Sequence, residues 1–320
     1  MHQSNAQDSY GKAIGFLLFG VAAGLSLDLA AKWLLVDYSL QQFVFLRSIF
    51  GVLVFLSLSR WFGGIGDLKT KRWKAHLLRT VLASGAMFGF FYGLKYMPLV
   101  NALTLAFTAP LIVTALSVPI LGEHVGWRRW LAVVVGFIGV MIVLRPGRGM
   151  LTPPALAIMV ASFCYAGLAI SARKLATTES SLSLSVYVIT GPLIISSFLL
   201  PGSYIAPTFN GWLLFLFAGF ASAGAWAGIV GGYRRAPPSM LAPFEYTALI
   251  GAAIAGYYIW GEVPDKWVIA GGTIIIASGL FIVYREVGSV MTGRYLRTFT
   301  AGGAASIVRR FRRRKNQNNS

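Results

Sequence analysis

Ionisable side chains inside long apolar runs are the residues of this sequence best placed to do chemistry. Glu245 lies two positions after Pro243 in the apolar run 236–260. Proline removes a backbone donor and opens a helix, so the freed backbone groups and the carboxylate predict a polar patch that faces a cavity. Glu245 is therefore either a proton-coupling site or a buried carboxyl that braces its neighbours.

Four other charged candidates lie within apolar runs. Asp28 and Lys32 are four positions apart in the run 11–35, so one helical face presents both. They either neutralise each other, meet the two ends of a zwitterionic ligand or exchange a proton, and Lys32 is also near enough to the end of its run to reach the interface. Arg47 is either a structural anchor beside an opposite charge or a ligand contact. Arg79 is expected to contact lipid head groups.

Uncharged polar and aromatic side chains complete the candidate ligand site. Asn101, Thr104 and Thr108 are spaced i, i+3, i+7, so they share one helical face. That face either hydrogen-bonds to other helices or contacts a ligand. The aromatic candidates either stack on a flat ligand or pack in the core, and they are Phe91, Tyr92, Phe107, Tyr165, Trp226, Phe244 and Tyr246.

The sequence lacks the residues that a disulfide framework, a zinc site or a common enzyme motif would require. Cys164 is the single cysteine, which excludes an intramolecular disulfide framework and a multi-cysteine zinc site. The sequence contains no Walker loop, Gly-x-Ser-x-Gly elbow or His-Glu-x-x-His motif. We therefore expect no enzyme, no metal and no cofactor, and any transport by this chain would have to run on a gradient.

The composition predicts an integral membrane protein. Hydrophobic residues make up 56% and charged residues only 12% of the 320 positions, with a mean hydropathy of +0.68, whereas soluble domains are nearer a quarter charged. A helical span needs about 20 mostly apolar residues. The sequence offers ten such runs: 11–35, 39–60, 75–94, 97–121, 127–145, 151–172, 182–204, 209–232, 236–260 and 265–284.

The basic residues predict the orientation of these runs. The net charge of +18 could indicate nucleic-acid binding, but the basic residues lie in short clusters between apolar runs and form no nucleic-acid motif. If the N-terminus is cytoplasmic, the cytoplasmic loops carry twelve basic residues and the tail nine. The opposite loops carry four: Lys95, Arg145, Arg148 and Lys266. The positive-inside rule therefore predicts that both termini are cytoplasmic, and the basic tail is expected to meet anionic lipid head groups.

The segment 224–262 repeats the segment 85–123 at a fixed spacing of 139 residues. Ten of the 39 aligned pairs are identical, including Gly89/Gly228, Pro98/Pro237 and Glu123/Glu262. Such self-similarity indicates duplication of a unit. Five runs per unit is an odd number, so the second unit must enter the membrane upside down. An inverted repeat of this kind is typical of secondary transporters.

The repeated segments resemble a known family. Tyr92-Gly93-Leu94, Tyr96-Met97-Pro98 and Gly122-Glu123 in the first half, and Ala236-Pro237-Pro238, Leu241-Ala242-Pro243-Phe244-Glu245-Tyr246 and Gly261-Glu262 in the second, resemble the EamA-like carriers of the drug/metabolite transporter superfamily. The resemblance covers residues 11–286. It implies ten helices, transport of a small organic metabolite, and a central cavity lined mainly by spans 1, 3, 4, 6, 8 and 9, which contain the aromatic candidates. Arg47 matches an arginine common in that family.

The motif Ala-Pro-Phe-Glu-Tyr at 242–246 is most similar to the branch that holds carriers of riboflavin and S-adenosylmethionine. Other members of the family export amino acids. We therefore expect an all-α, ten-helix carrier of the bacterial inner membrane, with riboflavin uptake slightly ahead of amino-acid or metabolite export. A membrane scaffold or sensor is the non-transport alternative. The expected organisation is a cytoplasmic N-terminus (1–10), two five-helix repeats (11–147 and 148–286) and a basic cytoplasmic tail (287–320). A homodimer is compatible with the sequence.

Overall fold

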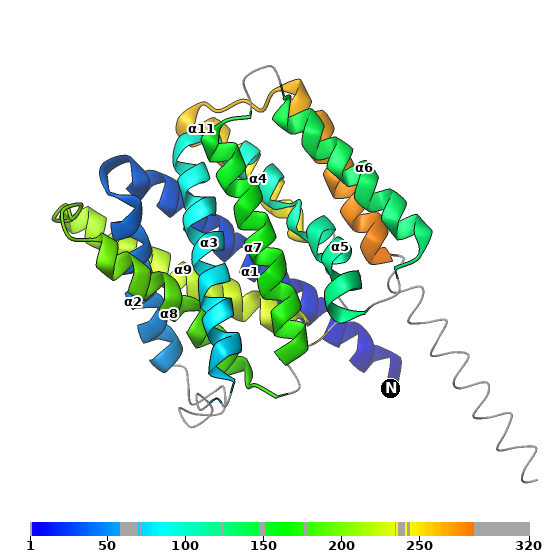
Figure 1. Ribbon diagram of the computed structural model, residues 1–320, viewed down its shortest axis with the longest axis horizontal. Helices are drawn as coiled ribbons and strands as arrows, with labels where there is room; N and C mark the ends of the chain where they lie inside the picture. The colour runs from blue at the N-terminus through cyan, green and yellow to red at the C-terminus, as the bar shows by residue number, and fades with distance from the viewer. Residues whose placement is uncertain are drawn as a thin grey trace, which may run out of the picture.

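The computed structural model describes residues 2–57, 70, 72–122, 125–146, 151–175, 178–233, 235, 241 and 244–284 (Figure 1). This part of the chain is helical and contains no strand, which confirms the predicted all-α membrane class. The labelled helices are α1 (His2–Asp37), α2 (Leu40–Ser57), α3 (Trp73–Tyr96), α4 (Leu99–Ala106), α5 (Ala109–Leu121), α6 (Trp127–Leu144), α7 (Pro153–Leu175), α8 (Ser181–Leu199), α9 (Phe209–Tyr233) and α11 (Thr247–Trp260). A last helix covers Lys266–Tyr284.

Seven of the described helical segments are long and apolar enough to cross a membrane. Three shorter apolar helices, Leu40–Val54, Val186–Leu199 and Thr247–Trp260, fall on the remaining predicted runs. The helical segments therefore match the predicted runs in position, while the number of ten crossings stays a prediction. α1 begins at His2, so the first helix also includes the polar residues 2–10 that precede the first predicted run.

The predicted run 97–121 is broken in its middle. α4 ends at Ala106 and α5 begins at Ala109, because the ring of Pro110 clashes with the carbonyl one turn earlier and cannot continue the ladder. Thr108 satisfies the local backbone instead, since its hydroxyl donates to the carbonyl of Leu105 at 2.7 Å. The corresponding run 236–260 also changes at its middle, where Tyr246 forms a turn before α11.

Two helix pairs hold the bundle together through close backbone contacts. α1 packs against α9 and α3 packs against α7. A Cβ atom on Gly20 would lie 2.6 Å from the backbone nitrogen of Ile229, and one on Gly228 would lie 2.5 Å from the Cα atom of Gly20. A Cβ atom on Gly89 would lie 2.6 Å from the carbonyl oxygen of Ala157. Only glycine permits these approaches.

The structure reproduces the 139-residue spacing of the sequence at several points. Gly89 and Gly228 occupy the corresponding contacts of the α3–α7 and α1–α9 pairs. The two helices α5 and α11 end on glycines with matching left-handed backbones, Gly122 at φ 68° and ψ 22° and Gly261 at φ 67° and ψ 21°. The rings of Phe107 and Tyr246, which are also 139 positions apart, pack on each other with centroids 4.9 Å apart. The two halves therefore meet at equivalent residues.

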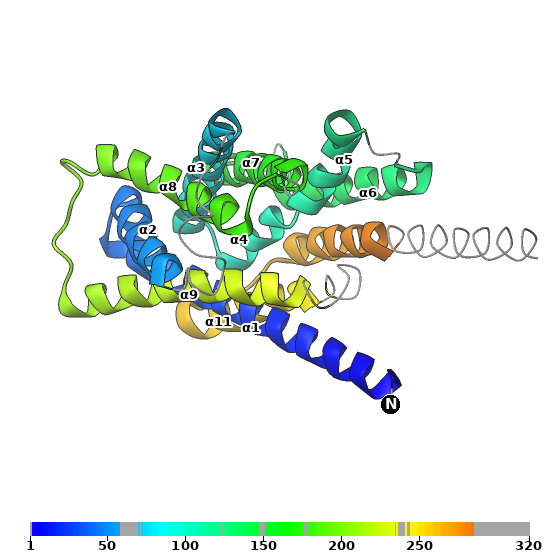
Figure 2. The same ribbon diagram turned by 90° about the horizontal axis from the view of Figure 1, so that it is seen from below.

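The helices form two layers with helices between them. Figure 2 shows α3, α7 and α8 in one layer and α1, α9 and α11 in the other, with α2 and α4 between them. α2 contacts both α8 and α9. The main hydrophobic core draws on both halves of the chain, and its fully buried side chains include Leu34, Phe43, Leu94, Leu99 and Phe215.

Replacement of Gly20 by valine should destabilise the protein by about 1–3 kcal/mol, because the added side chain overpacks the contact with α9. Gly15→Val on the same helix is the matched control, since nothing lies within 4 Å of a Cβ atom there. Thermal unfolding of the two purified variants in detergent compares them directly. We expect a clearly lower Tm for Gly20→Val, and equal Tm values would contradict the close contact.

Candidate functional site

Lys32 is the centre of a buried polar cluster at the end of the bundle where α1 ends. Its Nζ atom pairs with one carboxylate oxygen of Glu262 and donates to the carbonyl oxygen of Met97 at 3.0 Å. The other carboxylate oxygen of Glu262 accepts from the backbone nitrogen of Leu99, the first residue of α4, at 2.8 Å. We call these four residues the Lys32 cluster. It ties α1, the α3–α4 joint and the end of α11 together.

The Lys32 cluster answers one question that the sequence left open. Lys32 does not serve as the partner of Asp28, because its charge is taken by Glu262. The left-handed turn at Gly261 redirects the chain after α11, and the Glu262 backbone nitrogen donates to the carbonyl of Gly256. The ring of Trp260 covers the ammonium group, with its centroid 5.2 Å from the Nζ atom.

Arg47, a residue of α2, lies deeper in the bundle and contacts α3 and α9. Its Nη2 atom donates to the hydroxyl of Ser222 at 2.8 Å, and its Nη1 atom lies 3.0 Å from the sulfur of Met87. The guanidinium carbon lies 5.5 Å from the ring centroid of Phe91. Asp28 is the carboxylate that acts on it electrostatically. The anchoring alternative for Arg47 thus has contacts to support it. Its Nε atom is buried and has no hydrogen-bond partner in the described ranges.

A second group of candidates gathers around the meeting point of the two halves. Glu245 is half-buried and interacts electrostatically with Tyr165 of α7 and with Tyr246. The Tyr246 ring packs on Phe107, and its hydroxyl lies against Gly279, where a Cβ atom would be only 2.2 Å away. The side chain of Tyr165 is 60% exposed. A carboxylate with two phenol groups around it can hold a proton or accept hydrogen bonds from a ligand.

The polar face of α4 is buried within the protein. Thr104 and Thr108 are almost fully buried, and Thr104 packs against Gly272 of the last helix. Asn101 is also buried, and its side-chain oxygen has no hydrogen-bond partner in the part of the chain that the structure describes. This arrangement agrees with the expectation that a polar face inside a lipid-embedded helix turns toward protein.

The remaining aromatic candidates are dispersed. Phe91 is buried against Phe43, with ring centroids 4.8 Å apart, and Trp226 on α9 is 44% exposed. Tyr92 packs on Tyr96 near the end of α3, with centroids 5.1 Å apart. Phe244 packs against the small cluster of Ala13, Leu17 and Leu241. The structure therefore brings Phe91 beside Arg47 but places Tyr92 and Phe244 elsewhere.

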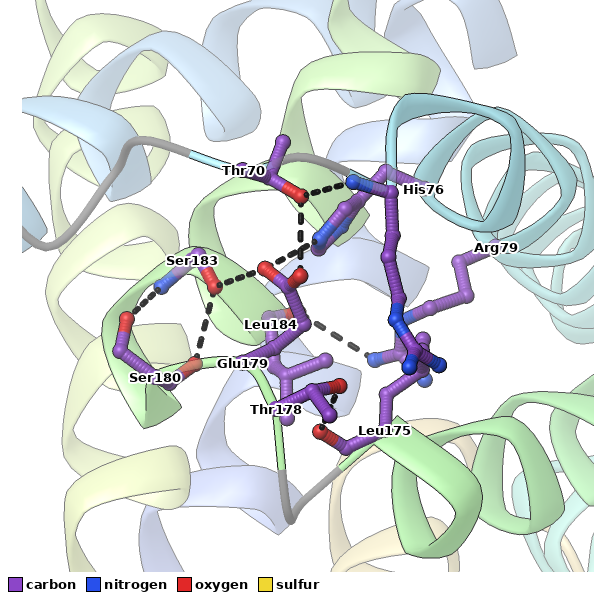
Figure 3. Close-up of polar contacts among 10 residues, drawn as sticks. Thr70, His76, Arg79, Leu175, Thr178, Glu179, Ser180, Ser183 and Leu184 are labelled. Carbon is purple, nitrogen blue, oxygen red and sulfur yellow. Dashed lines mark hydrogen bonds and ion pairs between the residues drawn. The ribbon is translucent and has the colours of Figure 1, made fainter.

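A further polar cluster at the opposite end of α3 was not predicted from the sequence (Figure 3). The Glu179 carboxylate, in the link between α7 and α8, lies 3.0 Å from the Nε2 atom of His76 and accepts from the hydroxyls of Thr70 at 3.0 Å and Ser183 at 3.4 Å. The rings of His76 and Tyr187 have centroids 4.4 Å apart. We call His76, Glu179, Thr70 and Ser183 the Glu179 cluster.

Arg79 lies beside the Glu179 cluster, and the prediction that it contacts lipid head groups is wrong. Its side chain is 4% exposed. It donates to the carbonyl oxygens of Leu168 and Leu184 and to the hydroxyl of Ser171 at 2.7 Å. Arg79 therefore joins α3 to α7 and α8. The physical reason is that α7 and α8 present carbonyl and hydroxyl oxygens to this face of α3, and a guanidinium supplies several donors at once.

The electrostatics of the Glu179 cluster favour the charged carboxylate. Burial acts to raise the pKa of Glu179, but the hydrogen bonds from His76 and Thr70 and the charge of His76 hold the pKa below its ordinary value. Asp265, in the link before the last helix, behaves in the same way, since burial acts to raise its pKa and contacts with Arg145 and with backbone nitrogens lower it. Among the described residues, no group of three or more His, Cys, Asp or Glu side chains could hold a metal ion.

Glu179→Gln should lower stability by about 1–3 kcal/mol at neutral pH, because the substitution removes the charge of a buried carboxylate and replaces one of its two acceptor oxygens with a donor. The folded pKa lies below the unfolded one, so this stabilisation is present above the unfolded value and is lost as the pH falls through the folded pKa. Thermal unfolding in detergent should therefore show a Tm gap between wild type and Glu179→Gln at pH 7 that closes below about pH 4.

Asp37→Asn is the control for this measurement, because Asp37 is an exposed carboxylate at the end of α1. We expect its Tm to follow that of the wild type at each pH. A Tm gap for Glu179→Gln that stayed constant down to pH 3.5 would show that the carboxylate charge does not stabilise the fold.

Comparisons with known proteins agree with this architecture. The model of the EamA-like transporter family matches residues 12–145 and 152–284. An S-adenosylmethionine uptake transporter of Rickettsia bellii is 30% identical over 284 residues, which cover 88% of this chain and 97% of that protein. A riboflavin transporter of Vibrio cholerae is 31% identical over 240 residues, covering 73% and 80% of the two chains. A solved crystal structure matches with a TM-score of 0.61 at 16% identity, covering 87% of this chain and 98% of that one.

Proposed function

Because the chain belongs to the EamA-like transporter family, we propose that it is a gradient-driven secondary carrier that takes up a flat or zwitterionic metabolite. The family, the relatives named as transporters and the membrane-spanning helices make it a multi-pass transporter of small metabolites in the bacterial inner membrane. The observation that carries the proposal is the meeting of the two halves at Phe107 and Tyr246. A carrier needs such a junction because its halves must move against each other around one site.

The second half is proposed to be an inverted copy of the first. The matching contacts of α1 with α9 and of α3 with α7 support this arrangement, as do the matching turns at Gly122 and Gly261. The positive-inside rule places the Lys32 cluster at the periplasmic end and the Glu179 cluster at the cytoplasmic end. Each cluster joins helices of both halves, so each would have to loosen when its end opens.

Trp127→Cys and Lys266→Cys should be labelled from opposite sides of the membrane. The two positions are 139 residues apart, and each is the exposed first residue of its helix. In a Cys164→Ser background, an impermeant thiol reagent added to intact cells should label position 266, and position 127 should react only after permeabilisation. Labelling of both positions from the outside would exclude the inverted repeat.

S-adenosylmethionine and riboflavin are the two substrate candidates. The relatives that carry these names match most of this chain, and the aromatic candidates suit a flat ring. S-adenosylmethionine comes first because the relative of that name matches over nearly its full length. The proposed ligand site leaves out Lys32, Tyr92 and Phe244, which have contacts elsewhere. It comprises the other predicted residues: Asp28, Phe91, Asn101, Thr104, Phe107, Thr108, Tyr165, Trp226, Glu245 and Tyr246.

Proteoliposomes that contain the full-length protein should take up labelled S-adenosylmethionine or riboflavin with saturable, substrate-selective kinetics and should show counterflow. Empty liposomes are the control. A scaffold or sensor would give no flux, and a channel would give flux without saturation or counterflow, so either result would contradict the proposal. Preloaded liposomes tested for loss of label distinguish uptake from export of an amino acid or another metabolite.

Glu245 is proposed to carry the coupled proton. Its half-buried carboxylate lies within electrostatic reach of Tyr165 and Tyr246 at the junction of the halves. In the same flux assay, Glu245→Gln should abolish the dependence of transport on the pH gradient while leaving counterflow in place. Asp37→Asn again provides the control carboxylate. A variant whose flux keeps its full pH dependence would remove Glu245 from the coupling mechanism.

A further inference from the structure

The guanidinium of Arg47 is a positive charge that forms no direct ion pair within the described part of the chain. A thioether and a hydroxyl, those of Met87 and Ser222, are the side-chain groups within hydrogen-bond distance of it, and neither carries a charge. Its Nε atom is buried and has no hydrogen-bond partner among the described residues. A guanidinium offers five donors in a fixed planar fork. A charge held inside a span at this depth is costly unless a counter-ion or ligand completes it.

Asp28 lies on α1, which packs against α9. α1 and α9 run along each other with Gly20 against Gly228 and Gly24 against Ala225. One further turn on each helix brings Asp28 to the level of Ser222, the residue that binds Arg47. The packing register therefore places the carboxylate of Asp28 and the guanidinium of Arg47 around one point between α1, α2 and α9.

Asp28 and Arg47 carry opposite charges but do not form a direct ion pair. The ion pairs within 4.0 Å among the described residues are Lys32 with Glu262, His76 with Glu179 and Arg145 with Asp265. Lys32, one turn from Asp28 on the same helix, is already taken by Glu262. Both Asp28 and Arg47 keep part of their surface accessible. Two opposite charges that stay apart match the two charges of a zwitterionic group.

We propose that Asp28 and Arg47 are the two ends of a site for the amino-acid head of a zwitterionic substrate. The substrate carboxylate would take the free donors of the Arg47 fork, which match a carboxylate in a bidentate geometry. The substrate ammonium would take the carboxylate of Asp28. This inference rests on the proposed carrier function and names the chemical class that the carrier selects.

The surroundings of Arg47 suit a substrate that has a flat ring behind its amino-acid head. Phe91 lies under the guanidinium, with its ring centroid 5.5 Å from the central carbon. Trp226 is one turn from Ser222 on α9 and is 44% exposed, so its ring is available for stacking. S-adenosylmethionine has both an amino-acid head and an adenine ring, whereas the riboflavin ring system carries neither an ammonium nor a carboxylate group. The site therefore favours the first candidate.

The test is a binding measurement on the purified full-length protein with S-adenosylmethionine and its decarboxylated analogue, which differ only in the carboxylate. Wild type should bind S-adenosylmethionine about 10- to 100-fold more tightly, since a hydrogen-bonded charge contributes that factor. Arg47→Met should reduce the affinity for S-adenosylmethionine by the same factor and leave the affinity for the analogue unchanged. Asp28→Asn should weaken binding of both ligands, because both keep the ammonium group.

Arg47→Lys and Arg128→Met complete the design. Arg47→Lys keeps the charge without the fork, so it should retain part of the discrimination and serves if Arg47→Met does not fold. Arg128→Met removes an exposed charge at the start of α6 and should match the wild type. A purely structural role of Arg47 would lower the affinities for both ligands equally and keep their ratio, which would overturn the inference.

The failure of this inference and of the carrier proposal give different results. Equal binding of S-adenosylmethionine and its decarboxylated analogue by wild type, or an unchanged ratio in a folded Arg47 variant, would overturn the Asp28–Arg47 site alone. Saturable flux of riboflavin without binding of either S-adenosylmethionine compound would also overturn it while supporting the carrier. Absence of saturable flux for every probe would instead contradict the carrier function and the inference together.

Discussion

The close approach of backbones at glycine is the constraint on which this structure depends. α1 and α9 touch at Gly20 and Gly228, and α3 and α7 touch at Gly89 and Ala157. Lipid tails are as apolar as leucine, so helices in a membrane associate through tight packing and hydrogen bonds rather than through exclusion of water. Each contact joins a helix of the first half to a helix of the second. These contacts therefore hold the two halves against each other.

The backbone repeats, but the charges do not. The positions 139 residues from Lys32 and Leu99 are Ser171 and Pro238, and proline has no backbone N–H to donate. The Lys32 cluster therefore has no chemical equivalent in the other half, although Glu262 has Glu123 as its counterpart in the sequence. Ser171 instead accepts from Arg79. The two ends are closed by different chemistry, which allows them to differ in strength in a protein built from two similar halves.

The sequence was sufficient for the helices and insufficient for the polar pairs. Apolar runs determine where helices form because a bilayer requires their length and hydrogen bonding, and the break near Thr108 follows from Pro110. Partners distant in the chain could not be found in this way: Lys32 and Glu262 are 230 positions apart, and His76 and Glu179 are 103 apart. Helical spacing pointed to Asp28 as the partner of Lys32, but packing against α11 decided otherwise. Arg79 failed for the same reason, because its partners are carbonyl groups of α7 and α8.

In the proposed carrier, the distribution of charge would separate the two ends that close it from the part that binds substrate. At the two ends, Lys32 with Glu262 and His76 with Glu179 are in direct contact, so each end is stabilised without a ligand. In the middle, Asp28 and Arg47 remain apart, and one buried donor of the Arg47 guanidinium has no partner in the part of the chain that the structure describes. A carrier gains from this arrangement, because a centre that satisfied itself would have no affinity left for a substrate, whereas ends that depended on substrate would stay open without it. The unsatisfied charge thus belongs where the substrate must bind.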